Sequence, residues 1–152
     1  NSYYISNLKN ENLINNLINI DKNFKKLYEN VEINNILDLY KKRSSTLLEL
    51  NRKISPYLNY NKTNIDKFDQ NNESHLIIKK FYIYIKNEMN WSKENIEKIS
   101  KEFVKNNNIK FPELGKPLRV ILLGTSDAPS ISEIMHALGK DKVLKRINNF
   151  LI

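Results

Sequence analysis

The sequence predicts an all-α protein built of two small helical subdomains. Apolar residues recur at the three-to-four-residue spacing of a helix along most of the chain. At two expected helix starts a serine or threonine stands three residues before a glutamate, which is the pattern of a capping box. The segment 56–72 contains proline and many asparagines but no sustained apolar period, so it resembles a linker. We therefore predict one subdomain over 1–70 and a second over 71–152.

The composition excludes several classes of protein. The 152 residues are 40% hydrophobic, which is enough for a packed core, and the absence of cysteine excludes disulfides and thiolate metal sites. No apolar run approaches the roughly 20 residues of a membrane span, and no apolar leader opens the sequence. These features predict a cytoplasmic protein with no membrane partner, and we expect it to be a monomer.

The formal net charge of +8 suits a polyanionic partner such as a nucleic acid. Asparagine, lysine and isoleucine dominate the chain, as in proteins encoded by AT-rich genomes, so part of the lysine excess can reflect mutational bias. A basic surface that serves only solvation is therefore the competing interpretation of the charge.

Residues 1–30 predict short helices. Asp21 is expected to cap the helix that carries the second of two apolar stripes. Tyr3 and Tyr4 could stack on nucleotides, but an aromatic pair beside a helix more often belongs to the core, so we predict no base-reading role for them. The two stripes consist of Leu13, Ile14, Leu17 and Ile18, and of Phe24, Leu27 and Tyr28.

A basic cluster follows the next helix, whose apolar face consists of Ile33, Ile36, Leu37 and Tyr40. The cluster is Lys41, Lys42 and Arg43, and a capping box of Thr46 and Glu49 then opens another helix. A guanidinium and two ammonium groups beside free backbone N–H donors at a helix start suit an anion such as phosphate. The competing interpretation is that the cluster only offsets the dipole of the helix that it ends.

The second subdomain is predicted to begin with a helix over 73–89. Its tail, 81–85, alternates enough to imitate a strand, which is the alternative there. Ser92 is expected to cap the next helix, and Trp91 to pack structurally rather than to stack on a base. Residues 109–116 are predicted to form a loop. The apolar side of the first helix is expected to carry Leu76, Ile77, Lys80, Phe81 and Tyr84.

The stretch 115–147 contains all three glycines and two of the four prolines of the chain. Pro117 is expected to open a helical turn, and Gly124 to close it in a left-handed conformation. A short buried strand over 118–123 is the alternative, because periodicity cannot separate the two over six residues.

Two helices are predicted after this turn. Ser130 and Glu133 form the second capping box, and Gly139 is expected to end that helix. Asp141 is expected to cap the last helix. The apolar faces of the two helices consist of Ile131, Ile134, Met135 and Leu138, and of Val143, Leu144, Ile147 and Leu151.

No catalytic or metal-binding constellation stands out. His75 and His136 are the only histidines, and they lie on different predicted helices. Ser126 and Asp127 are close to His136 in sequence, but nothing indicates the strained turn of a nucleophile. We predict no catalytic residue and no metal ligand in this chain.

Short segments in a fixed order carry a resemblance to a known family. They are Asn1-x-x-Tyr4-Ile5, Lys42-Arg43-x-x-Thr46-Leu47-x-Glu49-Leu50, Trp91-Ser92-x-Glu94-Asn95, Pro117-Leu118-Arg119-Val120 through Gly124, Pro129, Gly139-Lys140, and Val143-Leu144-x-Arg146-Ile147. Together they span nearly the whole chain and resemble the C-terminal region of bacterial-type glutamyl-tRNA synthetases. The chain departs from the pattern at Leu123, where the family usually has threonine, and at Ala128, where it usually has serine.

The resemblance implies an all-helical region that contacts the tRNA stem and binds the anticodon. It implies that an ATP-using catalytic domain with HIGH-type and KMSKS-type motifs lies upstream in a glutamate–tRNA ligase, a class I aminoacyl-tRNA synthetase. This chain alone is then expected to be inactive and to hold no cofactor, since ATP and magnesium belong to the catalytic domain. The implied partner is tRNA for glutamate, tRNA(Glu).

The resemblance also implies roles for particular residues. Arg43 is implied to read the third anticodon base, and Lys41 and Lys42 beside it are then expected to bind phosphate. Contacts with the first two bases carry over to Arg119, Ala128, Pro129 and Ile131. For Arg119, a charged group in an apolar run, an ion pair with an internal carboxylate such as Glu133 is the alternative. For the whole chain, the alternative function is a basic helical interaction module that binds nucleic acid or protein without anticodon specificity.

Overall fold

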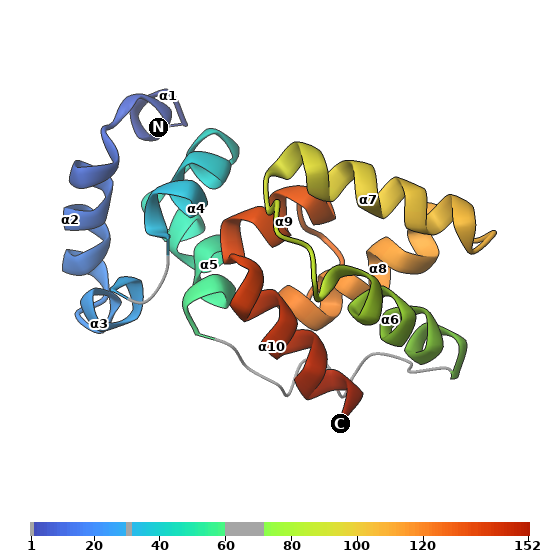
Figure 1. Cartoon of the computed structure of the whole chain (residues 1–152). Helices are drawn as coiled ribbons and strands as arrows, with labels where there is room; N and C mark the ends of the chain where they lie inside the picture. Colours follow the sequence, from blue (N-terminus) through green and yellow to red (C-terminus); the bar gives the residue numbers. More distant parts are fainter. Residues whose placement is uncertain (1, 30–31, 60–71) are drawn as a thin grey trace. The chain divides into compact units, whose positions relative to one another are not determined.

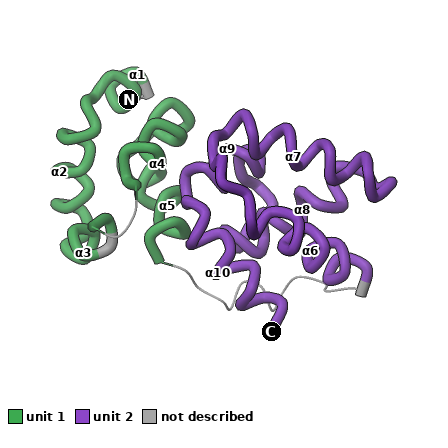
Figure 2. Tube along the Cα trace, viewed as in Figure 1, with its two compact units in different colours: residues 1–60 green, residues 61–152 purple. Residues whose placement is uncertain are grey.

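The structure is a computed structural model that describes residues 2–29, 32–59 and 72–152, and every regular element in these ranges is helical (Figure 1). The predicted all-α class is confirmed. The chain divides into two compact units, residues 1–60 and 61–152 (Figure 2). The predicted boundary after residue 70, and most of the predicted linker, lie outside the described residues, so that boundary stays a prediction.

Unit 1 contains α1 (Ser2–Asn7), α2 (Asn10–Ile20), α3 (Phe24–Tyr28), α4 (Ile33–Tyr40), the 3₁₀ turn η1 (Lys41–Arg43) and α5 (Leu47–Leu58). The predicted apolar stripes supply its core, because their inward residues are removed from water. The hydroxyls of Tyr40 and Tyr57 lie 2.8 Å apart in this core, and their rings meet edge to face. Fully buried core residues include Leu13, Leu17, Ile36, Leu37, Leu50 and Ile54.

Three expectations for unit 1 are wrong. Tyr3 and Tyr4 are 82% and 59% exposed, because the short helix α1 turns Ile5, and neither tyrosine, into the core. Pro56 lies inside α5 rather than in the linker, where its missing N–H costs one bond near the helix end. Asp21 does not cap α3, because the N-cap position of that helix is Asn23. The Asp21 carboxylate instead accepts a hydrogen bond from the Asn23 N–H at 2.9 Å.

Unit 2 contains α6 (Asn72–Ile85), α7 (Lys93–Asn106), α8 (Phe111–Leu123), α9 (Ile131–Leu138) and α10 (Lys140–Leu151). Helix α10 contacts α6, α8 and α9, while α7 contacts α8 and α9. The core lies between these helices. Its fully buried members include Ile78, Phe81, Ile85, Ile96, Leu118, Ile121, Ile134, Met135, Val143 and Ile147.

Helix α6 confirms a helix rather than a strand over 81–85, although it ends at Ile85 and not at residue 89. Its buried face differs from the expected one. Leu76 and Tyr84 are 52% and 43% exposed, and Lys80 is exposed as well. The buried face consists instead of Ile77, Ile78, Phe81 and Ile85. It is therefore rotated about the helix axis relative to the expected face.

Helix α8 begins at Phe111, so the loop expected over 109–116 is wrong. Pro112 lies in the first turn, and the Glu113 carboxylate accepts a hydrogen bond from the Lys110 N–H at 2.6 Å, which together start the helix early. Pro117 therefore lies inside α8 and does not open it. The strand alternative over 118–123 is excluded by the same helix.

Residues 124–130, which we call the corner, join α8 to α9. Gly124 ends α8 as predicted, with φ 76° and an N–H bonded to the Val120 carbonyl at 2.8 Å. Ser130 caps α9 as predicted, because its hydroxyl accepts from the Glu133 N–H at 3.3 Å. Gly139 ends α9 and, with φ 83°, also serves as the N-cap position of α10. Asp141 lies in the first turn of α10 and is not its cap.

Candidate functional site

The basic turn, Lys41–Arg43 of η1, lies in unit 1 and contacts α1 and α4. The buried hydroxyl of Ser44 donates to the Tyr40 carbonyl at 3.0 Å, which draws the chain into a tight turn where α4 ends. The ammonium of Lys53 donates to the Arg43 carbonyl and pairs with Glu49 at 2.8 Å. The turn is thus fixed from both α4 and α5.

The two lysines of the basic turn differ in availability. Lys41 Nζ lies 3.1 Å from Asp38 Oδ1 and 3.2 Å from Asn10 Oδ1, so its charge is already engaged. The hydrogen bond from Asn10 and the charge of Lys41 hold the pKa of Asp38 below its ordinary value, against the effect of burial. Lys42 is exposed, and its ammonium has no bonded partner among the described residues. Lys42 is therefore the better placed of the two for an external phosphate.

The start of α5 is less open to an anion than the sequence predicted. Thr46 Oγ1 accepts from the Glu49 N–H at 3.0 Å, which confirms the cap. The Glu49 carboxylate accepts from the Ser45 N–H at 2.8 Å and so occupies a donor expected to be free. Hydrogen bonds from Lys53 and Ser45 lower the pKa of Glu49. A negative group already sits at this helix start, so the Ser45 N–H is not available to an external anion.

Arg43 is exposed on the basic turn, and its Nη1 donates to the Leu39 carbonyl in the last turn of α4 at 3.2 Å. The interaction with the C-terminal end of a helix agrees with the competing dipole interpretation for this nitrogen. It also orients an exposed guanidinium at the surface.

Arg119, a site residue predicted from the sequence, connects the two ends of the corner in unit 2. Arg119 is half-buried, and its Nε donates to the Pro129 carbonyl at 2.9 Å, so it ties α8 to the far end of the corner. Its structural partner is thus a main-chain carbonyl and not the carboxylate of Glu133. The N–H groups on its two terminal nitrogens have no bonded partner within the described ranges.

The other residues predicted to contact the first two bases lie in or directly after the corner. Ala128 and Pro129 are half-buried. Ile131 opens α9 and is only 1% exposed as a residue. Its side chain therefore serves the core, and the residue offers almost no surface to a base.

Sequence reasoning missed Arg146, whose side chain is 5% exposed in α10. Its Nη1 donates to the Leu122 carbonyl at 2.6 Å, in the last turn of α8 immediately before the corner. The signal was present, because Arg146 shares the helical spacing of Val143, Ile147 and Phe150, which are all buried. A cation at that position of an apolar face needs a buried acceptor.

Trp91 holds α9 from the segment before α7. Its Nε1–H donates to the Met135 carbonyl at 2.9 Å, and His136 Nδ1 lies 3.0 Å from the Trp91 carbonyl, to which it can only donate. The structural role predicted for Trp91 is confirmed, although its partner is α9.

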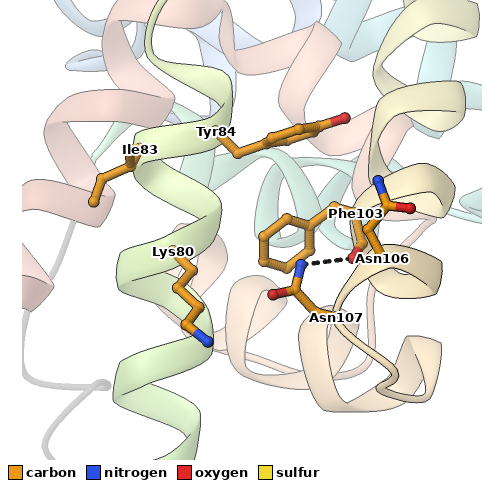
Figure 3. Close-up of a pocket in the computed structure, with 6 residues that line it drawn as sticks. All are labelled: Lys80, Ile83, Tyr84, Phe103, Asn106 and Asn107. Carbon is orange, nitrogen blue, oxygen red and sulfur yellow. Dashed lines mark hydrogen bonds between the residues drawn. The ribbon is translucent and has the colours of Figure 1, made fainter.

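Unit 2 also has an open pocket of about 340 Å³ between α6 and the end of α7 (Figure 3). Asn107 Nδ2 donates to the Phe103 carbonyl at 2.8 Å beside it, and burial, followed by the charges of Glu102 and Glu88, raises the pKa of Tyr84. No sequence-predicted site residue lines this pocket, so it is separate from the corner. Its lining consists of Lys80, Ile83, Tyr84, Phe103, Asn106 and Asn107.

The part of the chain that the structure describes has neither a metal cluster nor a membrane-spanning helix. No histidine, aspartate and glutamate side chains gather there in a group of three that could hold a metal ion. No helix there combines the length and the hydropathy that crossing a membrane requires.

Comparison with known proteins identifies the class of this chain. A family model described as the anticodon binding domain matches residues 11–151, and the chain belongs to this family. Glutamate–tRNA ligase 1 of Aliarcobacter butzleri is 36% identical over 157 residues, which cover 99% of this chain and 33% of the relative. Glutamate–tRNA ligase 1 of Campylobacter hominis is 33% identical over 155 residues, with 99% and 32% covered.

Solved structures with a similar fold are glutamate–tRNA ligases as well. The crystal structure of a glutamate tRNA ligase from Elizabethkingia meningosepticum matches with a TM-score of 0.77 at 18% identity, over 99% of this chain and 30% of that one. The chain is thus an anticodon-binding domain of the glutamate–tRNA ligase type, and it spans about a third of the length of the curated relatives that it matches.

Proposed function

We propose that this chain is the tRNA-recognising part of a glutamate–tRNA ligase and that it binds tRNA(Glu) through stem and anticodon. It acts as a monomer in the cytoplasm, without a membrane partner. It holds no cofactor of its own, because ATP and magnesium serve the attachment of glutamate in the catalytic part of such an enzyme. Membership of the anticodon-binding family and the net charge of +8 support this function.

The free guanidinium edge of Arg119 carries the proposal. A half-buried arginine that is oriented by one main-chain carbonyl keeps its terminal N–H groups available. Such a planar fork pairs with the edge of a base through two hydrogen bonds, and its orientation costs little on binding because the protein has already set it. We assign the first two anticodon bases to Arg119 together with Ala128 and Pro129 of the corner, while Ile131 anchors the start of α9 in the core.

We assign the third anticodon base to Arg43 and a neighbouring phosphate to Lys42, with Lys41 contributing its positive charge. Arg43 and Lys42 are both exposed on one three-residue turn, so they can meet one nucleotide together. The two side chains then do different work, since a guanidinium can read a base edge and an ammonium on a phosphate reads none.

The test compares binding of the full chain to the anticodon stem-loop of tRNA(Glu) and to stem-loops in which one anticodon base is replaced. Replacing Arg119 with alanine should weaken the cognate complex by about 1 to 3 kcal/mol and remove discrimination at the first or second base. Fluorescence anisotropy at fixed salt measures both effects. An equal loss for every stem-loop would make Arg119 a phosphate contact and would favour a basic module without anticodon specificity.

A further inference from the structure

Gly115 occupies an unusual place, because it lies buried in the interior of α8 with no left-handed backbone to require a glycine. Glycine weakens a helix relative to alanine. The residue therefore needs a reason in its surroundings. Close approach of another group to its Cα is the reason that remains.

The surroundings identify that group. A Cβ atom at position 115 would lie 3.0 Å from Nη1 of Arg119, and 3.5 and 3.6 Å from two ring carbons of Phe111. These three nearest atoms belong to side chains of α8 itself. The ring carbons would make ordinary contacts, whereas the contact with the Arg119 nitrogen would be tight enough that the guanidinium must move by a few tenths of an ångström. Gly115 thus leaves space for the guanidinium of Arg119, and not for the backbone of a neighbouring helix.

We propose that Gly115 is a positioning residue that sets the direction of the Arg119 guanidinium and with it the reading of an anticodon base. Two contacts fix the group, the hydrogen bond from Nε to the Pro129 carbonyl and the packing of Nη1 against Gly115. With both in place the remaining N–H groups keep one orientation. The inference rests on the proposed function, because it concerns specificity at the same corner.

The test is Gly115→Ala in the full chain. The new methyl group meets the far end of a flexible side chain, so the guanidinium shifts and the helix is kept. The melting temperature should stay equal or rise, because alanine favours the helix. Affinity for the cognate stem-loop should fall about tenfold, with a much smaller loss for a stem-loop whose first or second base is replaced.

Two controls separate the explanations. Lys116→Ala changes the adjacent exposed residue and should lower affinity for all stem-loops by one common factor. In an Arg119→Ala background, Gly115→Ala should add no further loss, because it acts only through Arg119.

The remaining outcomes contradict one proposal or the other. If Gly115→Ala leaves discrimination intact while Arg119→Ala removes it, Gly115 does not position the guanidinium, and the proposed function stands. Additive losses in the double variant would also overturn the inference. A lower melting temperature with one common loss for all stem-loops would make Gly115 a packing residue. If Arg119→Ala itself leaves discrimination unchanged, the base-reading assignment is wrong.

Discussion

At the scale of single residues, two arginines hold the two ends of the corner by different means. Arg146 is buried and bonds to the Leu122 carbonyl before the corner, whereas Arg119 is half-buried and bonds to the Pro129 carbonyl after it. A buried cation at a helix C-terminus is favourable because it meets the negative end of the helix dipole and an orphan carbonyl. Arg146 is thus structural, and Arg119 keeps N–H groups for a ligand.

Arg146→Met should lower the free energy of unfolding by about 1 to 3 kcal/mol, because a buried carbonyl loses its charged donor while the apolar stem is kept. Urea denaturation followed by circular dichroism measures the change. Lys145→Met, which alters the exposed neighbour on the same helix, is the matched control and should change stability little. Equal stability of the two variants would show that the bond from Arg146 to α8 contributes nothing.

At the scale of elements, the sequence predicted those features that depend on local chemistry. Gly124, Ser130, Thr46 and Ser92 end or begin helices where the turn and capping rules place them. The errors arose where packing decides. Pro117 lies within α8 although proline disfavours a helix interior, because the helix already begins at Phe111 and the burial of Pro117 inside unit 2 outweighs its cost.

The features of the candidate site likewise divide into those set by local sequence and those set by packing. The basic turn could be read from the sequence as a cluster of charges. Which lysine is free could not, because that depends on Asn10, which reaches Lys41 from 31 residues away. The space beside Gly115 and the burial of Arg146 likewise depend on tertiary structure, although the spacing of Arg146 within an apolar face was visible.

Asp38 connects three elements of unit 1, because Asn10 of α2 donates to it at 3.0 Å and Lys41 of η1 pairs with it from the end of α4. The pKa of Asp38 is lowered in the folded state, first by the bond from Asn10. Its stabilisation is therefore present above the pKa of an unfolded aspartate and is lost as the pH falls through the folded value.

Asp38→Asn should accordingly reduce stability near neutral pH, by at most about 1 kcal/mol because the carboxylate is largely exposed. The difference from the parent chain should shrink to nothing as the pH drops below the ordinary aspartate range. Urea midpoints measured from pH 7 down to pH 3 check this. A difference that is independent of pH would mean that the amide disturbs packing and that the carboxylate charge is unimportant.

At the scale of the whole molecule, a net charge of +8 favours binding to an RNA backbone without regard to sequence, so in the proposed function specificity must come from a few oriented groups. Each unit contributes one kind of surface with an arginine at its centre, the basic turn in unit 1 and the corner in unit 2. Phosphate contacts fix register without reading sequence, while base contacts discriminate. Measurements of affinity at several salt concentrations separate the phosphate contacts from the base contacts.

Lys42→Ala and Arg43→Gln make that separation within one turn. Lys42→Ala should weaken all anticodon stem-loops about equally and reduce the slope of log affinity against log salt by about 1, because one phosphate contact is lost. Arg43→Gln should reduce the preference between C and U at the third anticodon base, with a loss of about 1 to 3 kcal/mol for the preferred base. Lys41→Ala should change the salt slope less than Lys42→Ala, because Asp38 and Asn10 already engage the Lys41 ammonium. Titrations at several salt concentrations, with stem-loops that differ only at the third base, distinguish these effects. If Arg43→Gln lowers every affinity by the same factor, Arg43 binds a phosphate and unit 1 reads no base.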